Sequence, residues 1–186
     1  SANNTYALDP QTGAQVWTAA EGGWLSIGDG KLFIARASGV LSAYNLTPSA
    51  ALPPPSIPPP YQPPPIPPPV PSSSNWPTFA GNNQHTGLNA GETGVPPLTP
   101  AWSVGLGTSA LSPAVIQDGR VFVSGNLQSP VDMRVWSRVA ADGGPAWSFC
   151  VGDVASIGHP SVVNGRVYVQ KSNSTPSTEL YCINAW

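Results

Sequence analysis

The sequence has few charged residues, and this excludes several kinds of partner. Charged residues make up 9% of the chain and the net charge is −2. Nucleic acids and anionic membrane surfaces attract clustered lysine and arginine, which are missing here. The chain also has no apolar run of membrane-spanning length and no signal-peptide pattern. We therefore expect no nucleic-acid partner and no membrane span.

Cysteine and histidine are also scarce, with two of each. Cys150 and Cys182 are far apart in the sequence and lack the neighbouring histidines or cysteines that a zinc site needs. In an oxidising compartment we expect them to form a disulfide, and the alternative is two buried free thiols. His85 and His159 have no nucleophile elbow or comparable serine beside them, so we expect structural rather than catalytic roles.

The aspartates do not form a convincing metal site. Oxygen-rich turns can hold calcium, but an aspartate in a glycine-containing turn usually bonds its own backbone. This applies to four of the five candidates, and the fifth lies in a short loop; the five are Asp9, Asp29, Asp118, Asp142 and Asp153. We predict no bound metal and no cofactor.

Proline is abundant, and much of it lies in one segment. Pro53 to Pro71 holds 13 prolines in 19 positions. Proline locks φ and has no backbone N–H, so this segment is predicted to run as a polyproline II rod of about 3.1 Å per residue. It would act as a spacer or as a docking strand. Tyr61 and Ile66 interrupt the prolines and are candidate contacts to an apolar groove on a partner.

A short phrase occurs three times outside the proline segment. GDGKLFIA (28–35) returns as QDGRVFVS (117–124) and as VNGRVYVQ (163–170). Each copy has an Asp-Gly or Asn-Gly turn followed by alternating β-branched or aromatic residues, which indicates a β-hairpin. An apolar run precedes each turn. Both strands of three hairpins are therefore predicted from the sequence.

A second element accompanies these hairpins. Residues 5–17 form a predicted strand, a D-P-x-T-G turn and a second strand ending in tryptophan, and residues 134–149 repeat this plan. Partial copies occur at 41–46, 98–104 and 180–186. Together the two elements predict a unit of four antiparallel strands, in which a and b are the two strands of the repeated hairpin and c and d are the two strands of the second element. A period of this length is typical of β-propeller blades.

The segments ALDPQTGAQVW (7–17) and SPAVIQDGRVFV (112–123) resemble the PQQ-like repeat family, which includes quinoprotein dehydrogenases and non-enzymatic outer-membrane assembly lipoproteins. This resemblance implies an all-β fold of four-stranded propeller blades. The segment 75–91 is similar to the amino-terminal entry of such propellers, in its residues Trp76, Phe79, His85, Thr86 and Gly87. The resemblance implies that the d strand at 98–104 closes a blade.

The resemblance also assigns roles to individual side chains. It implies that Trp17, Trp102 and Trp147, which recur in d strands, dock one blade against the next. Trp24 and Trp136 lie elsewhere and are candidate partner contacts. Cys150 and Cys182 would lie on a d strand and on the next c strand, where a disulfide could tie neighbouring blades.

Counting strands places the proline segment inside a blade. The thirteen predicted strands run c, d, a, b, c before it and d, a, b, c, d, a, b, c after it, so they cannot close an ordinary ring. The predicted parts are residues 1–49 (the end of a propeller), 50–74 (the polyproline linker) and 75–186 (an entry segment and about two blades). The chain would be either a junction of two propellers or a subunit whose blades are completed by other chains.

These patterns favour a non-catalytic structural or protein-interaction scaffold in an extracellular or periplasmic space, as a subunit or segment of an assembly or filament. The partners would be proteins, through self-assembly or neighbouring propeller units. One alternative is a fragment of a PQQ-dependent dehydrogenase, although the calcium site, aspartate base and vicinal cysteine pair of those enzymes are not recognisable. The other is a glycan-binding propeller.

Overall fold

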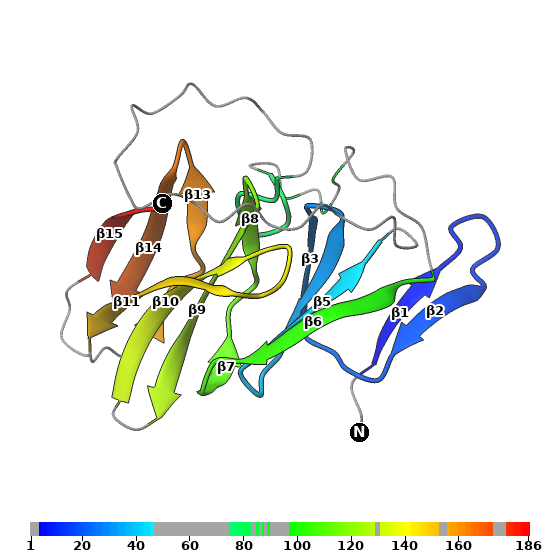
Figure 1. The fold of residues 1–186 in the computed structure, drawn as a ribbon, viewed down its shortest axis with the longest axis horizontal. Helices are drawn as coiled ribbons and strands as arrows, with labels where there is room; N and C mark the ends of the chain where they lie inside the picture. The colour runs from blue at the N-terminus through cyan, green and yellow to red at the C-terminus, as the bar shows by residue number, and fades with distance from the viewer. Residues whose placement is uncertain are drawn as a thin grey trace.

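A computed structural model describes residues 4–46, 75–82, 85, 87, 89, 97–128, 131–152, 156–172 and 178–186. All the regular elements in these residues are β-strands, and they form four antiparallel sheets. The sheets lie side by side in chain order, from β1 and β2 to β15 (Figure 1). This confirms the predicted all-β fold class. The proline segment, with Tyr61 and Ile66, lies outside the described residues.

The strands follow the predicted unit. The first sheet has β1 (Thr5–Leu8) and β2 (Gln15–Ala19). The second has β3 (Trp24–Gly28), β4 (Lys31–Ala35), β5 (Val40–Asn45) and β6 (Thr99–Gly105). The third has β7 (Thr108–Leu111), β8 (Val115–Gln117), β9 (Arg120–Gln128), β10 (Val131–Val139) and β11 (Pro145–Gly152). The fourth has β12 (Ser156–Ile157), β13 (Ser161–Val163), β14 (Arg166–Ser172) and β15 (Thr178–Asn184).

The described residues form fifteen strands rather than the predicted thirteen, because a separate strand, β7 or β12, precedes two of the predicted a strands. In the third sheet β7 and β8 both pair with β9, and in the fourth sheet β12 and β13 both pair with β14. The second and third sheets thus contain the complete a, b, c, d order. The first contains c and d, and the described part of the fourth contains a, b and c.

The strand that follows the proline segment completes the sheet that precedes it. β6 pairs antiparallel with β5, from Val40 opposite Gly105 to Asn45 opposite Thr99. The chain on the two sides of the segment therefore shares one sheet. The two predicted domain boundaries, after residues 49 and 74, lie within or at the edge of the part that the structure does not describe, and they stay predictions.

The three repeated hairpins have the turn that their sequence indicates. Asp29, Asp118 and Asn164 have φ values of 55°, 49° and 51°, and the glycine after each is also in the left-handed region. Two successive positive φ values match the twist of antiparallel strands, and glycine, aspartate and asparagine tolerate them best. In each of these three sheets, the carbonyl of the turn glycine accepts a hydrogen bond from the backbone N–H of the residue just after the c strand. The bonds run from Leu46 to Gly30, from Ala140 to Gly119 and from Ala185 to Gly165.

Three apolar cores fill the interfaces between the four sheets. In β9 the alternate residues Val121 and Val123 face the second sheet, while Phe122 faces the fourth. Because neighbouring side chains of a strand point to opposite faces, a sheet buried on both faces needs a continuous apolar run. This explains the phrase R-V-F-V in β9. Leu32 and Ile34 of β4 contribute to the remaining core, between the first and second sheets.

The segment after the proline-rich region contacts the a strands of three sheets. Trp76 exchanges two backbone hydrogen bonds of 2.8 Å with Ile116 of β8, and the carbonyl of Pro77 accepts a bond of 2.7 Å from Val162 of β13. The Asn89 amide donates to the carbonyl of Ile27 in β3. The Trp76 side chain is buried in the core between the second and third sheets. The segment therefore acts as an internal clamp.

Candidate interaction surfaces

A tryptophan in each d strand joins its sheet to the next one. The indole N–H of Trp102 donates to the carbonyl of Ala140 at 3.0 Å, and that of Trp147 donates to Ala185 at 3.0 Å. Both acceptors directly follow a c strand of the next sheet. Trp17 makes the equivalent bond, but to Leu98, just before β6. The structure thus places the three predicted docking tryptophans at the three joints between sheets.

An exposed aromatic cluster lies beside the clamp segment. It consists of Trp24, Phe79, His85 and His159. The ring centroid of Phe79 lies 5.6 to 6.2 Å from the ring centroids of the other three residues. The ring centroids of Trp24 and His159 are also 6.2 Å apart. Trp24 is 50% exposed and Phe79 is 40% exposed. Partial burial lowers the pKa of His159, which keeps its ring neutral at neutral pH. The predicted partner residue Trp24 is therefore available at the surface.

The other predicted partner tryptophan lies inside the protein. Trp136 is 7% exposed and belongs to the core between the second and third sheets. Its position in β10 alternates with Val135, which packs toward the fourth sheet. Trp136 therefore packs between sheets and is not a partner contact, which corrects the prediction.

The predicted disulfide is not present. Cys150 and Cys182 are both exposed free thiols. Their neighbours Phe149 and Tyr181 pack toward each other in the core between the third and fourth sheets, with ring centroids 5.7 Å apart. Side chains alternate along a strand, so the two cysteines point away from this core in opposite directions. The predicted strands were right, but the pleat separates the thiols.

Cys150 has a polar partner on its own sheet. Its thiol donates a hydrogen bond of 2.7 Å to a carboxylate oxygen of Asp132, whose other oxygen accepts from Arg134. The thiol and then the guanidinium hold the pKa of Asp132 below its usual value. Cys182 lies on β15 with the guanidinium of Arg166 4.0 Å from its sulfur.

The aspartates and histidines form no reactive group in the described part of the chain. Asp9 and Asp142 accept hydrogen bonds from backbone N–H groups of their own turns, whereas Asp29 and Asp118 are turn residues with positive φ. Asp153 lies outside the described residues, as does Thr86. In the described ranges no group of three or more histidine, cysteine or acidic residues has the arrangement of a metal site.

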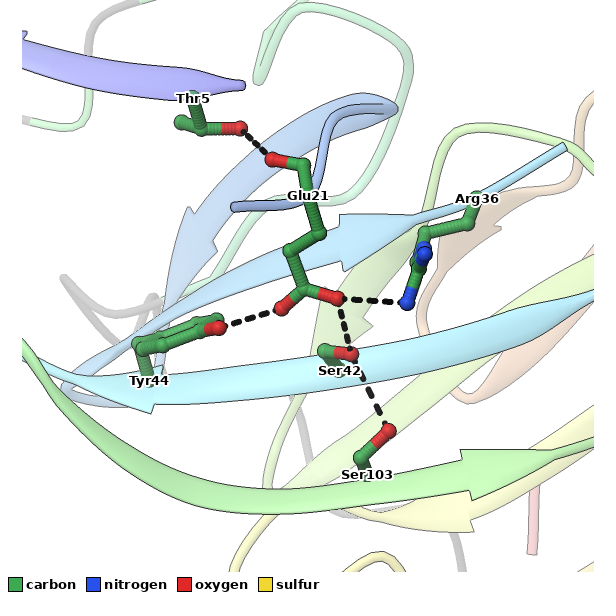
Figure 2. A network of polar contacts seen from close by, with 6 residues as sticks. All are labelled: Thr5, Glu21, Arg36, Ser42, Tyr44 and Ser103. Carbon is green, nitrogen blue, oxygen red and sulfur yellow. Dashed lines mark hydrogen bonds and ion pairs between the residues drawn. The ribbon is translucent and has the colours of Figure 1, made fainter. Parts of the chain in front are cut away.

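A network of polar contacts, the Glu21 cluster, consists of Thr5, Glu21, Arg36, Ser42, Tyr44 and Ser103 (Figure 2). One carboxylate oxygen of Glu21 accepts from Arg36 and from Ser42, each at 3.0 Å, and the other accepts from Tyr44 at 2.5 Å. The backbone carbonyl of Glu21 accepts from Thr5. Glu21 follows β2, while its side-chain partners lie on or beside β5, so the cluster ties the first sheet to the second.

An open pocket of about 410 Å³ adjoins this cluster, and it is lined by Glu21, Arg36, Tyr44, Trp102 and Ser103 among others. The polar groups of the lining are already bonded to one another. Ser42 shares a hydrogen bond with Ser103, and both oxygens of Glu21 are occupied. No histidine lines the pocket to act as a base toward a serine. The arrangement links the first sheet to the second.

Tyr44 provides a test of this joint at alkaline pH. Burial, followed by the hydrogen bond to Glu21, raises the pKa of Tyr44 to about 12. A raised pKa contributes stability that is complete below the unfolded value, near 10, and is lost as the pH rises through 12. We expect the protein to lose about 1 to 2 kcal/mol of unfolding free energy over this window through Tyr44, after allowance for solvent screening.

Urea unfolding of the protein and of Tyr44→Phe, at about pH 9 and about pH 11.5, measures this contribution. The variant should be less stable than the wild type at the lower pH, and the difference should shrink at the higher one. An equal difference at both pH values would contradict the role of the Tyr44 hydroxyl. Tyr6, which is 54% exposed, offers a control variant, Tyr6→Phe, which should unfold almost as the wild type does at the lower pH.

The sequence did not indicate the Glu21 cluster. Glu21 lies in the short stretch AEGG between two predicted strands and belongs to no repeated motif. Its partners are 15 to 23 residues away in the sequence. The one available signal is that Glu21 is an isolated acidic residue in a chain with few charges, and such a residue is worth testing as a buried partner.

No model of a known protein family matches the chain, and no curated protein matches its sequence. Among solved structures, BamB from Moraxella catarrhalis is similar at a TM-score of 0.36 and 11% sequence identity, over 98% of this chain. The chain spans 59% of the length of that protein. At this level of similarity, the comparison assigns the chain to no family.

Proposed function

We propose that this chain is a non-catalytic scaffold of propeller-type blades that binds other proteins by strand pairing. The observation that carries the proposal is that the four sheets are copies of one unit with different numbers of strands. The second and third sheets have the full a, b, c, d set, whereas the described part of the fourth has no d strand and that of the first has neither a nor b. An unpaired strand edge is a template for a further strand.

The joints between sheets support a structural role. Each uses an indole N–H from one sheet and a carbonyl at the next one, and each is closed by an apolar core. Repeated joints let identical units stack with nearest-neighbour contacts, as in other repeat proteins. The proposed location is extracellular or periplasmic, which the low charge and the many polar uncharged residues favour. In the described residues, no helix is long and apolar enough to cross a membrane.

Light scattering tests the assembly part of this proposal. We expect particles clearly heavier than the 19.2 kDa of one chain, with a size that rises with protein concentration. Strand pairing between chains is the physical reason, because it would satisfy backbone groups that are otherwise left at the open edges. A compact particle of one chain at all concentrations would contradict assembly.

The competing function, that of a quinoprotein fragment, has a separate test. Addition of pyrroloquinoline quinone and calcium should leave the absorption spectrum of the quinone and the melting temperature of the protein unchanged. Any ligand that binds the folded state raises the melting temperature by mass action. A saturable spectral change with thermal stabilisation would therefore overturn the non-catalytic proposal.

A glycan-binding function remains a second candidate, favoured by one observation. The aromatic cluster presents the exposed ring of Trp24 next to Phe79 and His159, and sugars stack on such rings through their apolar faces. A glycan array with the protein and with Trp24→Ala separates this candidate from the scaffold. Binding that is lost in the variant would favour the glycan-binding function.

A further inference from the structure

The c strands of the first three sheets hold their d strands in one register. The d-strand tryptophan lies opposite a small residue of the c strand, and the ladder has a bulge directly after that residue. The pairs are Trp17 with Ala7, Trp102 with Ala43, and Trp147 with Ser137. Three repeats of one register and one bulge show that the c strand selects how its outer neighbour pairs.

The fourth c strand, β15, has the same form. The residue after each of the last three c strands donates to a turn glycine, and that residue is Leu46, Ala140 or Ala185. Three residues before it lies the position opposite tryptophan, which is Ala43 in β5 and Ser137 in β10. In β15 this position is Cys182. The Cys182 side chain is exposed, as expected for a site that no tryptophan covers.

In the described residues, the edge of β15 that faces away from β14 has no partner strand. β15 pairs with β14 from Arg166 opposite Asn184 to Ser172 opposite Thr178, and no described strand pairs with its other edge. It contains neither proline nor lysine, two of the residues that commonly protect an edge, and its one charged residue is Glu179. Leu180 is 71% exposed there.

The existing d strands show which sequence this edge would take. The d strands of the two complete sheets share four residues. They are Pro100-Ala101-Trp102-Ser103 in β6 and Pro145-Ala146-Trp147-Ser148 in β11. The proline lies opposite Tyr44 in one sheet and opposite Arg138 in the other. Proline lacks a backbone N–H and fits the outermost strand of a sheet, where one side needs no hydrogen bond.

We propose that the free edge of β15 binds an antiparallel strand of the pattern Pro-Ala-Trp-Ser followed by an apolar residue, with its tryptophan opposite Cys182 and its proline opposite Ile183. This inference rests on the proposed function and names the partner chemistry. Residues directly opposite in a ladder share a face of the sheet. The indole therefore covers the Cys182 thiol on the face away from the third sheet.

Alkylation of the two thiols tests this proposal on the whole chain. The probe is a synthetic peptide with the sequence of residues 98–106, LTPAWSVGL. At saturation we expect it to slow the alkylation of Cys182 by about tenfold, since reaction requires an accessible thiolate. Cys150 lies on β11, the d strand of a sheet that is already complete. It serves as the internal control and should react at an unchanged rate. Mass spectrometry of digested protein reports each cysteine separately.

A second peptide with alanine in place of tryptophan tests the register. It should protect Cys182 much less, because the proposed cover is the indole. Unchanged alkylation of Cys182 with the first peptide, or equal protection by both, would overturn this inference. Either result would leave the scaffold proposal in place if light scattering still shows assembly. A quinone response would instead overturn the scaffold proposal, whatever the peptides do.

Discussion

Replacement of Gly39 by alanine is expected to lower the free energy of unfolding by more than about 3 kcal/mol, because it sets backbone against backbone at the contact between the second and third sheets. Gly39 has a φ of 76°, and a Cβ there would lie 1.8 Å from the carbonyl oxygen of Thr108. The Gly39 carbonyl also accepts a hydrogen bond of 2.9 Å from Leu106. This bond continues the pairing of β5 with β6 and holds the turn in place beside Thr108. Urea unfolding measures the change.

Gly13→Ala is the matched control. Gly13 has a similar φ of 71°, but nothing lies within 4 Å of a Cβ at that position. Its substitution should therefore cost only the left-handed backbone penalty of about 1 to 2 kcal/mol. The excess loss in Gly39→Ala measures the close approach of the two sheets. Equal losses in the two variants would show that this contact is unimportant for stability.

Replacement of Glu21 by alanine is expected to lower the free energy of unfolding by about 3 kcal/mol. The Glu21 side chain is 10% exposed and accepts hydrogen bonds from Arg36, Ser42 and Tyr44. Its removal leaves these donors without their acceptor, and a buried donor without a partner costs about 1 to 3 kcal/mol. Arg36, with its side chain 36% exposed, stays partly solvated and contributes less. Thermal and urea unfolding both report the loss.

Glu179→Ala provides a comparison at an exposed acidic residue. Glu179 is 50% exposed and forms an ion pair of 3.2 Å with Lys171. Glu179 also accepts a hydrogen bond of 3.0 Å from Tyr181, but its carboxylate is half exposed, so this variant should lose much less unfolding free energy than Glu21→Ala. If Glu21→Ala proved as harmless as Glu179→Ala, the cluster would not be the joint between the first and second sheets.

The joint at Glu21 differs from the others for a reason that the chain path supplies. Trp102 and Trp147 bond the carbonyl of the residue that directly follows the next c strand, which is Ala140 or Ala185, and after Ala140 the chain continues into its own d strand, β11. After the c strand β5, the chain instead leaves the sheet at Leu46 and returns at Leu98. Trp17 bonds the returning segment. The Glu21 cluster adds a second, polar link at this interrupted position.

The strands and turns could be predicted from the sequence because their signals are local. Asp-Gly and Asn-Gly turns specify positive φ within two residues, and alternation of apolar residues specifies a strand within five to seven. Those signals predicted the hairpins at Gly30, Gly119 and Gly165 and the d strand at Trp102. They also indicated that the proline segment interrupts a sheet. β7 and β12 were missed, because both are short and neither carries the turn or apolar pattern of the repeated unit.

The sequence by itself thus determined the repeated unit, the turn types and the all-β class, since each depends on residues that are close along the chain. Only the tertiary structure decided which faces met. It turned Cys150 and Cys182 away from each other, buried Trp136 and exposed Trp24, because the side on which a strand is covered depends on the neighbouring sheet. It also brought Glu21 to Tyr44 and Gly39 to Thr108. Such contacts depend on how whole sheets stack, and no local pattern contains that information.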